Sequence, residues 1–123
     1  MNLIQFEKWN TIVATIAFLI ALGTFSLTVE PTASYWDCAE YISTSAKLQI
    51  GHPPGAPLFQ MLGAFFSSFA FEVEQIAFMV NMMSVFASAF TILFLFLTTT
   101  IIGKKIILKT STITKPNAFI ILG

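Results

Sequence analysis

Charge is scarce in this sequence. Only 10% of its 123 residues are charged, against about 25% in a typical soluble domain, while 56% are hydrophobic and 14 are phenylalanine. A soluble core of this size cannot bury so much apolar surface, so membrane lipid must be the solvent for much of the chain. The net charge is zero, which gives no reason to expect a nucleic acid as a partner.

Cysteine and the common catalytic signatures are also scarce. Cys38 is the single cysteine, so an internal disulfide is excluded, and a lone cysteine is a poor metal site. The sequence has no convincing metal-ligand spacing, no phosphate-binding loop and no Ser/His/Asp order. We therefore predict no metal site and no certain cofactor, and leave divalent-metal dependence open.

Two long apolar runs predict an all-α membrane protein. Residues 11–29 carry no charge and would form about 28 Å of helix, enough to cross the hydrocarbon core. A cleaved signal peptide is the alternative, but the run exceeds the usual roughly 7–15 apolar residues and no A-x-A site follows. Residues 76–102 form the clearest span, which must tilt or begin in the headgroup layer because of its length.

The segment between the spans, residues 30–75, is the more polar part. Ser34 and Asp37 fit a capping box, which predicts an amphipathic helix over residues 35–50 near the headgroups. A His-Pro-Pro-Gly turn ends this helix, because each residue before a proline is pushed out of the helical region. Residues 57–71 are apolar but short for a span, which predicts a re-entrant or interfacial helix.

The lysines predict the topology. Four of the six lie in residues 103–117, which the positive-inside rule makes a cytoplasmic basic loop. Residues 30–75, with five acids and one lysine, then face outward, and residues 1–10 form a cytoplasmic N-terminus. Residues 118–123 resemble the start of a third span, so we expect the N-terminal part of a longer polytopic protein. If residues 57–71 crossed fully, the polar segment would be cytoplasmic instead.

A polar stripe follows the second predicted span at helical spacing. Small and hydroxylated residues of this kind mark helix–helix contacts in membranes, so we predict a packing face there. A ligand-lining role for its first member is the weaker alternative. The members are Asn81, Ser84, Ser88 and Thr91.

Two acids are the candidate catalytic residues. Asp37 and Glu40 are three residues apart, so on a helix they share one face with Cβ atoms roughly 5–6 Å apart. Carboxylates close to each other and to lipid should have a raised proton affinity, which suits a general base acting on a hydroxyl. Each acid also has a structural interpretation, since Asp37 could complete the capping box and Glu40 could be a solvated acid near the helix start.

Three nearby side chains are candidate substrate-binding residues: Tyr41, Lys47 and His52. Lys47 could bond Thr44, reach toward Glu40 or meet a lipid phosphate, while a histidine in such a turn is more often a stabilising donor than a catalyst. The residues alone are compatible with several kinds of protein. The chain could be part of an enzyme, a small non-enzymatic membrane subunit, a proton- or ion-conducting helix pair, or a hydrolase with paired carboxylates about 5 Å apart.

Two motifs between the spans, W-D-C-x-E-Y at residues 36–41 and H-P-P-G-x-P-L-F at residues 52–59, carry a resemblance. Over about residues 9–102 the chain resembles the start of a family of large polytopic proteins. These are the bacterial relatives of the vertebrate transmembrane O-mannosyltransferase that modifies plexin-type receptors, and they belong with the GT-C membrane glycosyltransferases.

The resemblance implies the N-terminal fragment of a polytopic GT-C-like helical bundle in the bacterial cytoplasmic membrane, with its active loop facing outward. It implies transfer of a sugar, mannose among them, from a polyprenyl-phosphate donor to a Ser/Thr hydroxyl of a protein acceptor. Such enzymes place a catalytic acid in the first outward loop, so Asp37 would be the base and Glu40 its neighbour. Several GT-C families have adjacent Asp-Glu here, whereas these acids are three apart, which leaves the base open between them.

Overall fold

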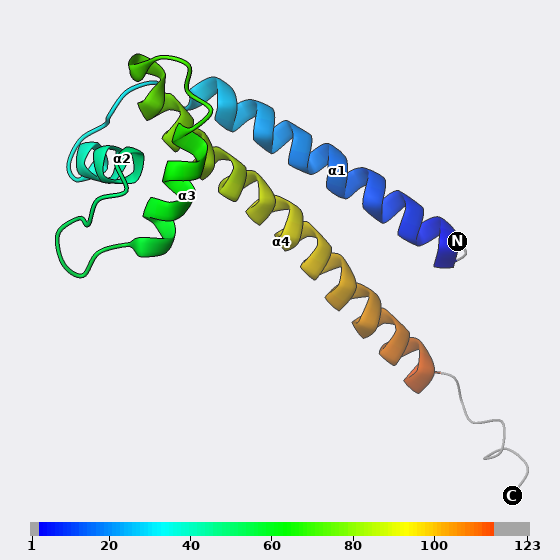
Figure 1. The fold of residues 1–123 in the computed structure, drawn as a ribbon. Coiled ribbons are helices and arrows are strands. Elements are labelled where there is room, and N and C mark those ends of the chain that lie inside the picture. The colour runs from blue at the N-terminus through cyan, green and yellow to red at the C-terminus, as the bar shows by residue number, and fades with distance from the viewer. Residues whose placement is uncertain (1–2, 115–123) are drawn as a thin grey trace, which may run out of the picture.

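Two long antiparallel helices dominate the computed structural model, which describes residues 3–114 (Figure 1). The elements in order are α1 (Leu3–Thr28), α2 (Cys38–Ala46), α3 (Pro57–Ser67), the 3-10 turn η1 (Val73–Gln75) and α4 (Ile76–Thr114). α2 and α3 gather at the end where α1 finishes and α4 begins. Both α1 and α4 are long and apolar enough to cross a membrane, so the predicted all-α class is confirmed for the described residues.

Side-chain contacts join α1 and α4 along their length. The rings of Phe18 and Phe90 pack with centroids 4.9 Å apart. At the end far from α2, Lys104 forms an ion pair with Glu7 and stands 5.2 Å from the centroid of the Phe6 ring. The ammonium group therefore interacts with a carboxylate and with an aromatic face, which also attracts a cation. These contacts hold the two helices as an antiparallel pair.

Asn81 ties the start of α4 to the chain that leaves α1. Its side-chain amide donates to the backbone oxygens of Glu30, at 2.9 Å, and Thr32, at 3.0 Å. This structural role accounts for the amide without a ligand. The rest of the predicted polar packing face is not used among the described residues, because its other members are exposed and α4 buries apolar side chains instead. The exposed members are Ser84, Ser88 and Thr91, and the buried ones are Val80, Val85 and Ala89.

Both long helices extend beyond the predicted spans. α1 begins at Leu3 rather than at residue 11, and α4 continues to Thr114, so a helix replaces the predicted loop over residues 103–114. Lysine, glutamine and glutamate are good helix formers, so a helix can continue where the apolar run stops. The remainder of that loop and the predicted third span, residues 115–123, lie outside the described residues.

α2 is shorter than the helix predicted over residues 35–50. It begins at Cys38, so the N-cap position falls on Asp37, which makes no side-chain capping bond. Trp36 before it and Leu48 after it have positive φ angles, 68° and 49°. A bulky residue in the left-handed region cannot belong to a right-handed helix. The predicted capping box is therefore wrong, and α2 is confined between these two residues.

α3 packs tightly on α2. A Cβ added at Gly63 would stand only 2.6 Å from Ser45 Oγ, and both residues are buried. On its other side, the Phe66 ring lies 5.9 Å from that of Phe86 on α4. With 11 residues, α3 is only about 16 Å long, short of the roughly 30 Å hydrocarbon core. This length fits the predicted re-entrant or interfacial helix better than a full crossing.

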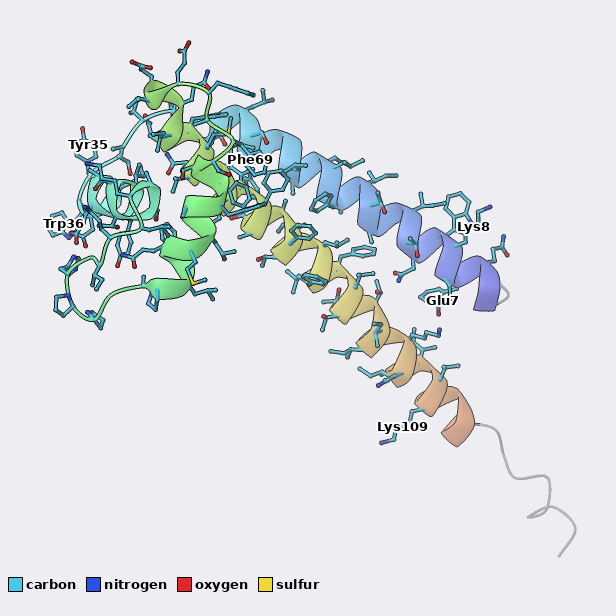
Figure 2. All side chains as sticks on the ribbon, viewed as in Figure 1. Glu7, Lys8, Tyr35, Trp36, Phe69 and Lys109 are labelled. Atoms are coloured by element: carbon cyan, nitrogen blue, oxygen red, sulfur yellow. The ribbon has the colours of Figure 1, made fainter. Side chains whose placement is uncertain are left out.

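The two tryptophans lie near opposite ends of the α1–α4 pair. Trp9 belongs to the second turn of α1, and Trp36 lies in the connection before α2. Both side chains are exposed, by 55% and 92%. Figure 2 shows Trp36 beside Tyr35 at the α2 end, far from Glu7 and Lys8 at the other end of α1.

Candidate functional site

Glu40 and His52 are joined by two contacts across twelve residues of sequence. The His52 backbone N–H donates to Glu40 Oε1 at 2.7 Å, and His52 Nδ1 lies 2.8 Å from Oε2. An ionised carboxylate can only accept hydrogen bonds, so Nδ1 carries the hydrogen in this arrangement. Glu40 comes from the first turn of α2, and His52 opens the His-Pro-Pro-Gly turn. The pair therefore fixes the α2–α3 loop to α2.

These contacts shift the pKa values of both groups. The backbone hydrogen bond from His52, reinforced by its side-chain bond, lowers the pKa of Glu40 below the ordinary 4.5. The side-chain bond to Glu40 raises the pKa of His52 above 6.5, and the negative charges of Glu40 and then Asp37 add to that shift. The raised proton affinity predicted for an acid of this pair is therefore wrong for Glu40, because hydrogen bonds to its charged form outweigh desolvation.

Tyr41 forms an aromatic wall beside the imidazole. Its ring meets the His52 ring edge-on with centroids 6.4 Å apart, and the Phe59 ring of α3 at 5.3 Å. The Tyr41 side chain is half-buried. Tyr41 therefore lies beside His52 with its ring packed against two neighbours, and its role in binding substrate stays a prediction.

A small polar cluster lies directly beneath the pair. Gln60 of α3 is buried and donates to Thr44 Oγ1 at 3.3 Å, and Thr44 donates to the backbone oxygen of Glu40 at 2.8 Å. A Cβ at Gly51 would stand 3.1 Å from Gln60 Nε2 and 3.2 Å from Glu40 Oε1. Sequence reasoning missed Gln60, although an amide early in an otherwise apolar helix was a usable signal.

Asp37 lies at the edge of the site. Its side chain is exposed, and within the described residues its carboxylate makes no hydrogen bond or ion pair. Its backbone oxygen accepts the Tyr41 N–H at 3.0 Å, which sets Asp37 directly before the first turn of α2. Asp37 is near enough for its charge to act on His52. The structure therefore places both predicted acids near His52, with the Glu40 carboxylate hydrogen-bonded and the Asp37 carboxylate without a partner among the described residues.

The Lys47 side chain makes no polar contact with the other candidate site residues among residues 3–114. It is exposed at the C-terminal cap of α2, and it forms no ion pair with Glu40 or any other residue between 3 and 114. Its predicted bond to Thr44 is absent from this part of the chain, where the Thr44 hydroxyl bonds the backbone of its own helix. The same described residues contain no group of three or more His, Cys, Asp or Glu side chains that could hold a metal ion.

The arrangement combines a free carboxylate with one that is already held by an imidazole. A free carboxylate at a site of this kind can accept a proton from a hydroxyl. The site lies where two helices of membrane-spanning length meet two short ones. Fold and site thus define an all-α membrane protein with an acid-bearing segment at one end of its helix pair.

Residues 37–123 match the family described as Protein O-mannosyl-transferase TMEM260 N-terminal domain. The match covers most of the chain and every candidate site residue, and the chain belongs to this family. Membership supports a membrane protein with a glycosyltransferase function. No curated protein and no solved structure matches the chain.

Proposed function

We propose that this chain is the N-terminal part of a polytopic GT-C-type membrane glycosyltransferase. The reaction is transfer of a sugar, such as mannose, from a polyprenyl phosphate to a Ser or Thr hydroxyl of a protein, on the outer side of the bacterial cytoplasmic membrane. The family match and the two apolar helices support this proposal. Its partners are the membrane lipid, the lipid-linked donor and the protein acceptor.

The assignment of the base rests on the different hydrogen bonding of the two carboxylates. Both oxygens of Glu40 are engaged by His52, and its lowered pKa makes it a poor proton acceptor. Asp37 is exposed and its carboxylate is free within the described residues. We therefore assign the general base to Asp37 and give Glu40 a supporting role.

The transfer uses the Asp37 carboxylate, the acceptor hydroxyl and the lipid-linked sugar. The Asp37 carboxylate takes the proton of the acceptor hydroxyl while the hydroxyl oxygen attacks C1 of the sugar. The bond between C1 and the phosphate oxygen breaks, and the polyprenyl phosphate leaves with the electron pair. Attack opposite the leaving group inverts the configuration at C1. Lys47, exposed and unpaired among the described side chains, is the candidate contact for the donor phosphate.

Asp37→Asn tests this assignment. The amide keeps the shape of the side chain but cannot accept the proton, so sugar transfer to a hydroxyl-bearing peptide should fall by ~10²–10⁴-fold. Binding of the polyprenyl-phosphate sugar should survive, because it does not use that proton. The assay uses membranes holding the full-length protein.

Glu40→Gln is the matched comparison. It should cost less than Asp37→Asn, and the two changes together should be far from additive because the residues act as one unit. A larger loss in Glu40→Gln would exchange the two roles. Turnover at the wild-type level in both single variants would refute the transferase site.

The proton- or ion-conducting alternative gains no support from the geometry. Asp37 and Glu40 lie in α2 and the connection before it, not on either of the two long helices. Glu7, the acidic residue of α1, is paired with Lys104 of α4. The candidate acids thus do not line a path between α1 and α4.

A further inference from the structure

We propose that His52 is a positioning residue, which holds Glu40 as a fixed anion through Nδ1 and its backbone N–H and so leaves Asp37 as the acid of the site that is free to accept a proton. This role rests on the proposed glycosyl transfer. It differs from the substrate binding that the sequence predicted for His52, because the imidazole acts through Glu40.

The two contacts together fix the carboxylate. They engage different oxygens of Glu40, at 2.7 and 2.8 Å, so the carboxylate cannot rotate about its terminal bond without losing both. The backbone N–H donates whatever the protonation state of the ring, whereas the Nδ1 bond gains strength when the ring is charged. The backbone contact keeps Glu40 in place, and the imidazole sets how strongly it is held.

The imidazole is itself held by its surroundings. The Tyr41 ring meets it edge-on with centroids 6.4 Å apart, and the Phe59 ring of α3 packs against Tyr41 at 5.3 Å. The titratable groups that face the imidazole are Glu40, Tyr41 and, by its charge, Asp37. α3 contributes the Phe59 ring, which does not titrate.

Gly51 allows the loop to approach the carboxylate. A side chain there would press on Glu40 Oε1 and Gln60 Nε2, both within 3.2 Å of the Cβ position. Contacts this close are tighter than ordinary packing, so the glycine lets the next residue, His52, place its N–H on Glu40. The close approach of the loop at Gly51 and the contacts between His52 and the Glu40 carboxylate therefore depend on each other.

Two substitutions separate the positions of the ring nitrogens. The asparagine amide nitrogen is as many bonds from Cβ as Nδ1, and the glutamine amide nitrogen is as many as Nε2. We expect His52→Ala and His52→Gln to lower sugar transfer by about 10–100-fold, the cost typical of losing a partner that orients a metal ligand. His52→Asn should recover most of that loss. Gln49→Ala, an exposed change in the same loop, is the control and should leave transfer unchanged.

A direct measurement of the imidazole complements the activity assay. NMR titration of the full-length protein with labelled histidine gives the His52 signal as the one missing from His52→Asn. Glu40→Gln should lower its titration midpoint, because the bond and charge that favour the protonated ring are removed.

Three results would overturn the role. An unchanged midpoint in Glu40→Gln, beside an active wild type, would show that the pair does not form. Activity of His52→Asn as low as that of His52→Ala would refute the role of Nδ1, and recovery in His52→Gln instead would assign the role to Nε2. No transfer by the wild-type protein would overturn the proposed function itself, and this role with it.

Discussion

Glu40 and His52 titrate on opposite sides of a narrow pH range, and their contact should be strongest inside it. The pKa of Glu40 is lowered on folding, so its contribution to stability is complete above the ordinary 4.5 and is lost as pH falls through the folded value. The pKa of His52 is raised, so its contribution is complete below 6.5 and is lost as pH rises through the folded value.

Amide hydrogen exchange across the α2–α3 loop should show this dependence. Protection of the His52 amide, corrected for the intrinsic rate, should be greatest between pH 4.5 and 6.5. Above that range protection should decline only partly, because the backbone N–H still donates to the ionised carboxylate. In Glu40→Gln the pH dependence should flatten. Equal pH dependence in the variant and the wild type would contradict this account.

The sequence was sufficient to select candidate site residues but not to show how they pair. Asp37, Glu40 and His52 could be selected because acids and a histidine are conspicuous in an apolar chain. The spacing of the acids suggested that they act on each other, but Glu40 turns to His52. That pairing depends on the path of residues 47–51, including a left-handed Leu48, which no periodic pattern encodes.

The start of α2 gives a prediction that reverses the one from sequence. A capping Ser34 would have made Ser34→Ala cost ~0.5–2 kcal/mol. The helix instead begins at Cys38 and Ser34 is exposed outside it, so the change should stay within about 0.5 kcal/mol, as surface substitutions usually do. Chemical denaturation in detergent, followed by circular dichroism, measures this. A loss above 1 kcal/mol would restore the capping box.

The contact between α2 and α3 should be intolerant of added volume. Gly63→Ala places a methyl group 2.6 Å from Ser45 Oγ, and overpacking of this kind typically costs about 1–3 kcal/mol. The matched control is Gly23→Ala in α1, where nothing lies within 4 Å of the added carbon. That change should stabilise slightly, by roughly 0.5–1 kcal/mol, because alanine favours helix over glycine.

Thermal unfolding of both glycine variants checks the contrast. Adding Ser45→Gly to Gly63→Ala should recover part of the loss, because it removes the Oγ and Cβ that the new methyl group meets. Equal unfolding temperatures for the two single variants would argue against the close approach of α2 to α3.

The helices could be predicted where length and hydropathy decide, and their ends could not. Uninterrupted apolar runs identify α1 and α4 because a span must satisfy its backbone internally and bury no charge. The ends differ because hydropathy marks the lipid-facing part of a helix, not the helix. The lysines at 104, 105 and 109 therefore continue α4 instead of forming a loop. The helix predicted over residues 35–50 was longer than α2, because the sequence pattern did not show the left-handed residues on either side of it.

α4 is longer than a bilayer is thick. α4 has 39 residues, about 58 Å of helix against a hydrocarbon core of roughly 30 Å. Its basic end must therefore project beyond the lipid if the other end begins near the opposite headgroups. The Glu7–Lys104 ion pair lies toward this projecting end. Such a pair is placed more favourably in a hydrated layer than among lipid tails.

Cysteine labelling tests the orientation. In a Cys38→Ser background, cysteine in place of Ser34 should react with an impermeant thiol reagent on intact spheroplasts, because the lysine bias predicts that residues 30–75 face outward. Cysteine in place of Lys105 should react only after the membrane is opened. The opposite pattern would invert the topology and put the proposed transfer on the cytoplasmic side.

The positions of Trp9 and Trp36 make the chain its own optical probe. Within these 123 residues, Trp9→Phe or Trp36→Phe leaves one indole, at a known end of the helix pair. In sealed vesicles, iodide added outside can quench only the emission of the indole on that side. Because both side chains are exposed in this part of the chain, their emission reports insertion and orientation in real time, without a chemical label or a foreign residue.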